Sequence, residues 1–339
     1  MWIRSAVMLF LMVLAVQSQG PIPIILDTDI GGDIDDALAL ALALQSPELD
    51  VRAVTTVFED TEGRARVAWK ELGLYGRHDV PLAAGAVETL LDPKVVRPAP
   101  AQFKVLTPQD TLPAGARQHA VDLIITTLLA SPRKVTLVPI GPMTNIALAL
   151  KTEPRIKEKI ERIVLMGGSF DLLIPEYNIN RDAAASAIVF NSGVPITAVG
   201  LDVTLKCQLA GSDLERLRKA DHPAARFLVQ LIELWQGGRA DRYPTLHDPL
   251  AVAVAFLPSL IETQLGWVEV EYSGTTATRG LTIFTPAAEV PGRYMPLFPI
   301  STRQPKDVPA TTLVAKQVKV REFLDLFVER LAAAPRRQR

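Results

Sequence analysis

Residues 26–36 read "LDTDIGGDIDD" and continue the apolar stretch "PIPIIL" of residues 21–26. An isoleucine-rich apolar run that ends in acids is typical of a buried strand. The segment "DDALALALALQSPE" that follows contains good helix formers and no internal glycine or proline. The stretch therefore predicts a strand, a tight turn at the two glycines and a helix.

Alternation of strand-like and helix-like segments continues along the chain. Further strands are expected at "DVRAVTTVF", "VPLAAGA", "KVTLVPIGP", "ERIVLMGGS" and "VPITAVGLDVT", and further helices over about 115–130, 182–192, 212–236 and 318–333. Fully apolar strands that alternate with helices predict one α/β domain. Its sheet is expected to be open, mainly parallel and Rossmann-like, with helices on both faces.

Two segments depart from this alternation. The strands "GWVEVEYS" and "RGLTIFT" have period-two patterns, which predict a small antiparallel addition near the C-terminal end. Residues 93–114 are proline-rich and aperiodic, so they are expected to form a long surface excursion within the same domain.

The sequence composition limits which binding partners and which cellular compartment are expected. The net charge is −1, and the basic residues cluster only in the terminal "RRQR", so no nucleic-acid partner is expected. The N-terminus has one arginine, a short apolar run and a small polar stretch, which predicts a signal peptide over residues 1–20, a mature domain over 21–339 and export to the periplasm or medium. No membrane association is expected after cleavage.

The single cysteine, Cys207, excludes an intrachain disulfide and is interpreted as a structural thiol.

Five carboxylates crowd the opening stretch, at Asp27, Asp29, Asp33, Asp35 and Asp36. Such charges repel one another and are costly to desolvate. Ligands bind at the carboxyl ends of parallel strands, and a helix N-terminus accounts for only one or two of these acids. A hard divalent cation such as Ca²⁺ or Mg²⁺ accounts for more, because carboxylate oxygens are its preferred ligands.

Three kinds of metal site compete to explain this spacing. An EF-hand loop is excluded, because Leu38 stands where a bidentate glutamate is required. A phosphatase of the haloacid dehalogenase type, with an aspartate nucleophile, fits "IILDTDIGG" locally but lacks the distal acidic pair, since "HDP" supplies one acid. A hydrolase with a metal-held water is the third interpretation.

Several motifs in series resemble the nucleoside hydrolases, the inosine-uridine-preferring group and its relatives. They are "DTDIGGDIDDALAL", "VTTVFEDT", "LVPIGPMTNIALAL", "IVLMGGS", "PEYNINRDAAAS" and "HDPLAVA". The likeness covers roughly residues 22–333 in consistent order, and a series of motifs is more specific than any one of them.

The resemblance implies an N-ribosyl hydrolase with Ca²⁺ in its active site and a nucleoside as substrate. It makes Asp29 both a metal ligand and the general base, and His247 the histidine beside the leaving base. The other implied metal ligands are Asp36, the main-chain carbonyl of Ile140, and Asp248. The groups implied to hold the ribose and its water are Asp35, Asp60, Glu176 and Asn178. Relatives are often dimers or tetramers, so a homodimer or homotetramer is expected.

Some residues lie outside those assignments. Trp235, Arg242 and Tyr243 precede His247 in a glycine-containing loop and are candidates to contact the base. Asp27 and Asp33 are expected to support the ligands; the turn "IGGDI" is two residues longer than the commoner motif, which leaves open whether Asp33 or Asp35 meets the ribose. A nucleoside-binding protein without turnover remains an alternative. The remaining histidines are interpreted as surface or capping residues: His78, His119 and His222.

Overall fold

The computed structural model describes residues 20–92, 97–287 and 309–335. The predicted signal peptide, apart from Gly20, and the terminal "RRQR" lie outside these residues. Among the helices of the described ranges, none is long and apolar enough to span a membrane.

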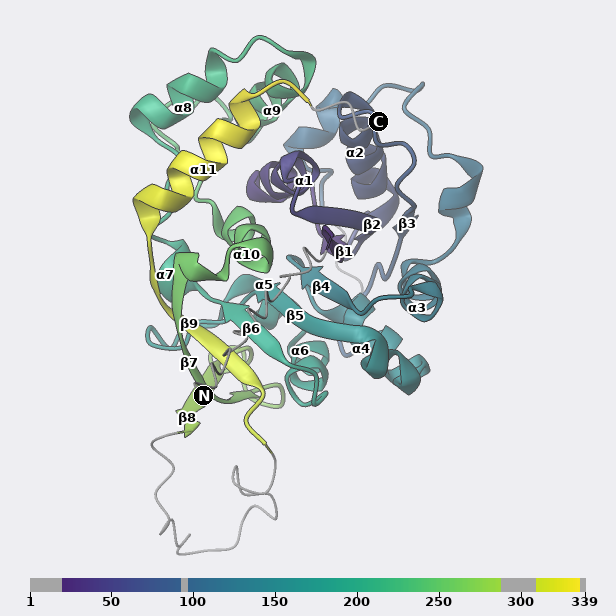
Figure 1. Cartoon of the computed structure of the whole chain (residues 1–339), viewed down its shortest axis with the longest axis vertical. Helices are drawn as coiled ribbons and strands as arrows, with labels where there is room; N and C mark the ends of the chain where they lie inside the picture. The colour runs from purple at the N-terminus through teal and green to yellow at the C-terminus, as the bar shows by residue number, and fades with distance from the viewer. Residues whose placement is uncertain (1–19, 93–96, 288–308, 336–339) are drawn as a thin grey trace, which may run out of the picture.

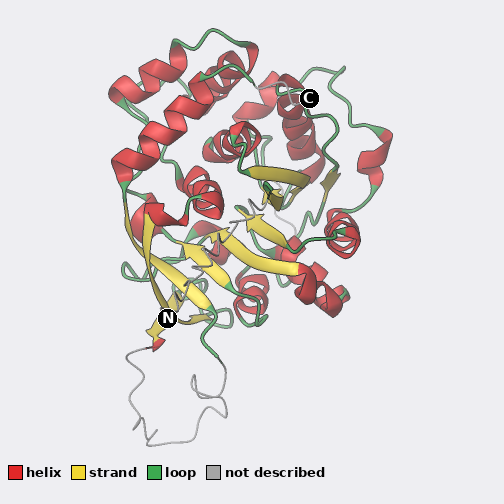
Figure 2. Cartoon of the chain, viewed as in Figure 1, coloured by secondary structure: helices red, strands yellow, loops and turns green. Residues whose placement is uncertain are grey.

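One nine-stranded sheet forms the centre of the fold (Figures 1 and 2). Its strands lie in the order β3-β2-β1-β4-β5-β6-β9-β7-β8. Each pair from β3 to β9 is parallel, and β7 pairs antiparallel with both β9 and β8. The strands are β1 Ile22–Thr28, β2 Leu49–Thr56, β3 Leu82–Ala84, β4 Val135–Pro139, β5 Ile160–Met166, β6 Ile196–Val199, β7 Ile261–Val270, β8 Thr282–Pro286 and β9 Thr312–Val318. The run β3-β2-β1-β4-β5-β6 is the doubly wound order, so the predicted fold class is confirmed.

Helices cover both faces of this sheet (Figure 1). One face carries α1 Asp35–Gln45, α2 Thr61–Leu74, α8 Gly211–Arg218, α9 Pro223–Gln236, α10 His247–Phe256 and α11 Val320–Ala332. The other carries α3 Ala120–Ala130, α4 Thr144–Thr152 and α6 Ala183–Phe190. The short helices are α5 Tyr177–Arg181 and α7 Leu201–Thr204, with 3₁₀ turns η1 Ala101–Val105, η2 Ala114–Arg117, η3 Pro154–Lys159 and η4 Pro258–Leu260. Every residue of α1 is buried, as expected for a helix that is apolar on all sides.

Several boundaries differ from the sequence-based expectations. The helix expected over 212–236 is two helices, because Pro223 begins α9 and the His222 ring accepts a hydrogen bond from the Ala225 N–H at 3.1 Å. The helix expected over 182–192 is α6, which begins after its capping residue Asp182, and the short α5 that precedes it was not predicted. The helix expected from about 115 begins at Ala120, capped by His119.

The antiparallel addition also needs a strand that the pattern did not predict. The predicted pair is confirmed as β7 and β8, with Trp267 opposite Thr285. The missing strand is β9, which pairs parallel with β6 on one side and antiparallel with β7 on the other. It therefore joins the addition to the parallel sheet. Within residues 93–114, the described part from 97 onward contains η1 and part of η2.

Candidate active site

A cavity of about 510 Å³ lies at the carboxyl ends of the central strands. Most of the residues predicted for the site line it, although they come from distant parts of the chain: Asp29, Asp33, Asp35, Asp36, Ile140, Glu176, Asn178, Trp235, His247 and Asp248. Asp29 follows β1, Ile140 follows β4, and Asp248 lies in the first turn of α10. The parallel sheet thus gathers these groups at one edge, where open α/β sheets bind their ligands.

Four aspartates form the acidic floor of this cavity: Asp29, Asp35, Asp36 and Asp248. Each is at most 7% exposed. One carboxylate oxygen from each of Asp35, Asp36 and Asp248 lies within 4.8 Å of the other two. Burial first, and then the neighbouring carboxylates, raise the pKa of Asp36 and of Asp248 well above its usual value. This concentration of negative charge favours a cation at the point where the oxygens meet.

Hydrogen bonds fix the position of Asp36 within the floor. Its Oδ1 accepts from the Thr28 hydroxyl at 2.5 Å and from the Asp29 N–H at 3.1 Å. The Thr28 hydroxyl oxygen in turn accepts from the Ile30 N–H at 3.0 Å. The end of β1 and the start of α1 are therefore tied together through one carboxylate.

The donor set fits a hard divalent cation. It consists of carboxylate oxygens with the Ile140 carbonyl nearby, and oxygen-only sites of this kind suit Ca²⁺ or Mg²⁺. The Ile140 carbonyl accepts from Asn178 Nδ2 at 2.9 Å, which orients it, and its second lone pair stays available. The residues present could thus hold a metal ion at Asp35, Asp36 and Asp248, whose carboxylate oxygens lie together, whereas the resemblance implied Asp29 in place of Asp35.

Glu176 and Asn178 enter the cavity from the start of α5. Glu176 Oε1 accepts from the Asn178 N–H at 2.8 Å, and Oε2 accepts from the N–H groups of Ile179 and Gly168 at 3.0 and 3.1 Å. Burial raises the Glu176 pKa to about 7 despite these bonds. Glu176 is both the cap of α5 and an acceptor at the cavity wall.

Most of the groups predicted to meet the base also line the cavity. His247 lies with its Nδ1 2.7 Å from the Thr204 hydroxyl, and burial lowers its pKa. The neutral imidazole is therefore favoured. The Arg242 guanidinium lies 3.6 Å from the centre of the Trp235 ring and donates to the Trp235 carbonyl at 2.7 Å. This stacked pair forms part of the cavity rim.

Three predicted site residues do not line the cavity. Asp60 caps α2 through the Gly63 N–H at 2.9 Å and borders a separate cavity, and the Tyr243 side chain is 37% exposed. Asp27 is fully buried and accepts from Thr55 and Asn145 at 2.6 and 2.8 Å. A phosphatase would use Asp27 as its nucleophile, so this burial argues against the phosphatase interpretation.

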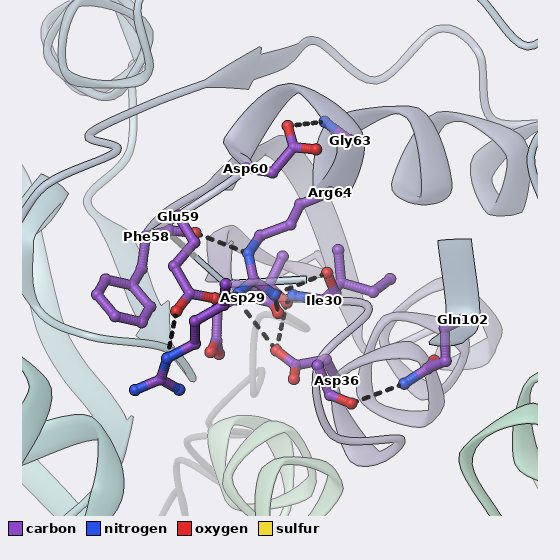
Figure 3. Close-up of polar contacts among 12 residues, drawn as sticks. Asp29, Ile30, Asp36, Phe58, Glu59, Asp60, Gly63, Arg64 and Gln102 are labelled. Carbon is purple, nitrogen blue, oxygen red and sulfur yellow. Dashed lines mark hydrogen bonds and ion pairs between the residues drawn. The ribbon is translucent and has the colours of Figure 1, made fainter. Parts of the chain in front are cut away.

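Two polar residues that sequence reasoning did not single out contact the acidic turn (Figure 3). Gln102 of η1 donates to the carbonyls of Gly32 and Asp33 at 3.1 and 2.7 Å. Arg64 of α2 donates to the carbonyls of Asp29 and Ile30. Both residues are buried. In the sequence Arg64 stands in a polar helical segment and Gln102 in the proline-rich excursion. Polar residues in such segments are normally solvated.

Comparison with known proteins agrees with this geometry. The family model described as Inosine-uridine preferring nucleoside hydrolase matches residues 24–325. A pyrimidine-specific ribonucleoside hydrolase, RihA, of Photobacterium profundum is 37% identical over 324 residues, which are 91% of this chain and 98% of that protein.

Solved structures give the same result. A plant nucleoside hydrolase, PpNRh1, superposes with a TM-score of 0.81 at 30% identity, over 92% of this chain and 99% of that one. A purine-preferring ribonucleoside hydrolase from Gardnerella vaginalis has a TM-score of 0.76 at 31% identity, over 91% and 98% of the two chains. The chain therefore belongs to the inosine-uridine-preferring nucleoside hydrolase family and is an N-ribosyl hydrolase.

Proposed function

We propose that the enzyme hydrolyses the N-glycosidic bond of ribonucleosides in a Ca²⁺-dependent reaction that yields ribose and the free base. The convergence of Asp29, Asp35, Asp36 and Asp248 carries this proposal. Cleavage of the bond builds positive charge on the sugar, and an acidic cavity stabilises that charge. A bound Ca²⁺ would acidify a water and hold vicinal hydroxyls.

Side chains of the cavity supply the base, the ribose contacts and the contact with the departing base. Asp29 is assigned as the base that accepts the proton of the attacking water, because it lies in the cavity beside the proposed metal ligands. Asp35, Glu176 and Asn178 offer acceptors for the ribose hydroxyls. The neutral ring of His247 supports a hydrogen bond to the departing base, oriented by Thr204.

Pyrimidine ribonucleosides are proposed as the preferred substrates. The support is the similarity to RihA proteins, which are named pyrimidine-specific ribonucleoside hydrolases and are 35–38% identical to this chain. A panel of uridine, cytidine, inosine and adenosine tests this preference by the rate of ribose release.

One assay tests the reaction itself. The purified mature chain is incubated with the nucleoside panel in Ca²⁺ or in a chelator, and ribose release is measured for the wild type and Asp29→Ala. We expect release from uridine that is abolished by the chelator and by the substitution. Nucleoside binding without release would instead support a binding protein, and release unaffected by the chelator would contradict the metal requirement.

Export of the enzyme is likewise a proposal, supported by the apolar N-terminal segment before residue 20. Mass spectrometry of the protein from its native host tests it. A mature N-terminus near Gly20 is expected, and an intact Met1 on the cytoplasmic protein would contradict it.

A further inference from the structure

Arg64 is a buried arginine that connects the two loops that follow the neighbouring strands β1 and β2. Its side chain is 2% exposed. Its Nη1 donates to the carbonyl of Asp29, and to that of Ile30 at 3.0 Å. Its Nε donates to the carbonyl of Phe58 at 2.7 Å (Figure 3). The guanidinium therefore spans the turn after β1 and the loop after β2.

The second of these loops has an unusual backbone. Phe58 and Glu59 have φ angles of 69° and 61°, a left-handed conformation that non-glycine residues rarely adopt. Their N–H groups donate to Ala86 and Val87 carbonyls at 2.7 and 2.9 Å, so the surrounding structure imposes this shape. Strained backbone of this kind concentrates at functional sites. In this loop the strain places the Phe58 carbonyl where Arg64 reaches it.

Arg64 has two opposing effects on a cation at the acidic floor. Its positive charge repels the cation, whereas its hydrogen bonds hold the turn that carries Asp29. Glu59 lies 3.4 Å from the guanidinium and offsets part of its charge, while its other carboxylate oxygen pairs with Arg97 at 3.2 Å. Because the charge is partly neutralised and the hydrogen bonds are made to main-chain carbonyls, the positioning effect is the larger one.

We propose that Arg64 is a positioning residue that holds the acidic turn of residues 29–34 in its cation-binding shape before the cation arrives. This inference rests on the proposed Ca²⁺-dependent function. Arginine suits the role because its donors are spread over a planar fork that reaches carbonyls in both loops, whereas the three N–H donors of lysine all lie on one nitrogen. Arg64 acts on the main chain of this turn, since no side-chain atom of Asp29 takes part in the contact.

Two measurements on the metal-free protein test the proposal. The first is calorimetric titration with Ca²⁺, and the second is amide hydrogen exchange of residues 29–34. The variants are Arg64→Met, Arg64→Lys and the matched control Arg66→Met. Arg66 lies on the same helix and also donates to main-chain carbonyls, those of Thr107 and Asp110, away from the acidic floor.

We expect both Arg64 variants to bind Ca²⁺ about tenfold more weakly or worse, as for other residues that orient metal ligands. Exchange of residues 29–34 should be faster in both, and Arg66→Met should match the wild type within about twofold in affinity. Calcium binding by Arg64→Lys at wild-type strength would overturn the proposal, and tighter binding by either variant would show that charge repulsion dominates.

The two readouts separate this inference from the proposed function. A wild type that binds no Ca²⁺ would refute the metal requirement, and the exchange rates would still decide the role of Arg64. Unchanged exchange of residues 29–34 in the variants would overturn that role. If Arg64→Met does not fold, Arg64→Lys keeps a buried cation beside Glu59 and decides the question alone.

Discussion

The main-chain N–H of Asp248 donates to the carboxylate of Asp35 at 3.3 Å, across 213 residues of sequence. This contact joins the first turns of α10 and α1, so both helices direct their N-termini at the same acidic floor. Positive helix ends reduce the cost of the clustered carboxylates. They do not remove it, because burial and mutual repulsion still raise the pKa of Asp35 and of Asp248.

Asp248→Asn should therefore raise the stability of the metal-free protein and lower its activity. The variant removes one of four carboxyl groups whose burial and mutual repulsion oppose folding, with little change in shape, so the metal-free protein should melt about 2–4 °C higher. Its activity in Ca²⁺ should fall at least about 100-fold, because a proposed metal ligand is lost. Thermal melts in chelator and ribose-release assays measure the two effects. A lower melting temperature in chelator would contradict the repulsion argument.

Trp235→Ala should weaken substrate binding more than it slows the reaction. Trp235 and Arg242 form the stacked pair at the rim, and stacking on an aromatic ring is worth about 1–3 kcal/mol per base. We expect KM for uridine to rise about tenfold with a smaller change in kcat. Tyr243→Ala is the control, because Tyr243 lies outside the cavity lining. An equal rise in KM for both variants would restore Tyr243 as a base contact.

Cys207 should be inert while the protein is folded. The thiol is fully buried, and burial raises its pKa to about 12. A water-soluble disulfide reagent at pH 8 should not react with the native enzyme, and should titrate one thiol in guanidinium chloride. Cys207→Ala should retain the wild-type rate of ribose release. Rapid reaction of the native enzyme would contradict the structural interpretation.

The local parts of this site could be predicted from sequence, because they depend on neighbouring residues. The acids between Asp29 and Asp36 lie in one turn, and their placement after a buried strand already predicts a cation site. The contacts of Arg64 and Gln102 depend on how α2 and η1 pack against that turn. No periodicity distinguishes such residues from solvated ones. Strand β9 was missed for a similar reason, since its role follows from its partners β6 and β7.

Glu71 lies on α2, away from the cavity, and predicts a pH dependence of stability. Its side chain is fully buried, and within the described part of the chain neither carboxylate oxygen has a hydrogen-bond partner. Burial raises its pKa well above the usual 4.5. Below pH 4.5 the folded and unfolded states both carry the proton. Above that pH only the folded state retains it, so stability falls by about 1.4 kcal/mol per pH unit until the folded pKa is reached.

Glu71→Gln should remove this loss, because the amide is neutral at every pH. The variant should have the same free energy of unfolding as the wild type near pH 4.5 and a higher one at pH 8, as measured by urea denaturation. Glu62→Gln is the matched control, because Glu62 is exposed on the same helix and should show no such divergence. A constant difference between Glu71→Gln and the wild type from pH 4.5 to pH 8 would show that Glu71 does not retain its proton in the folded state.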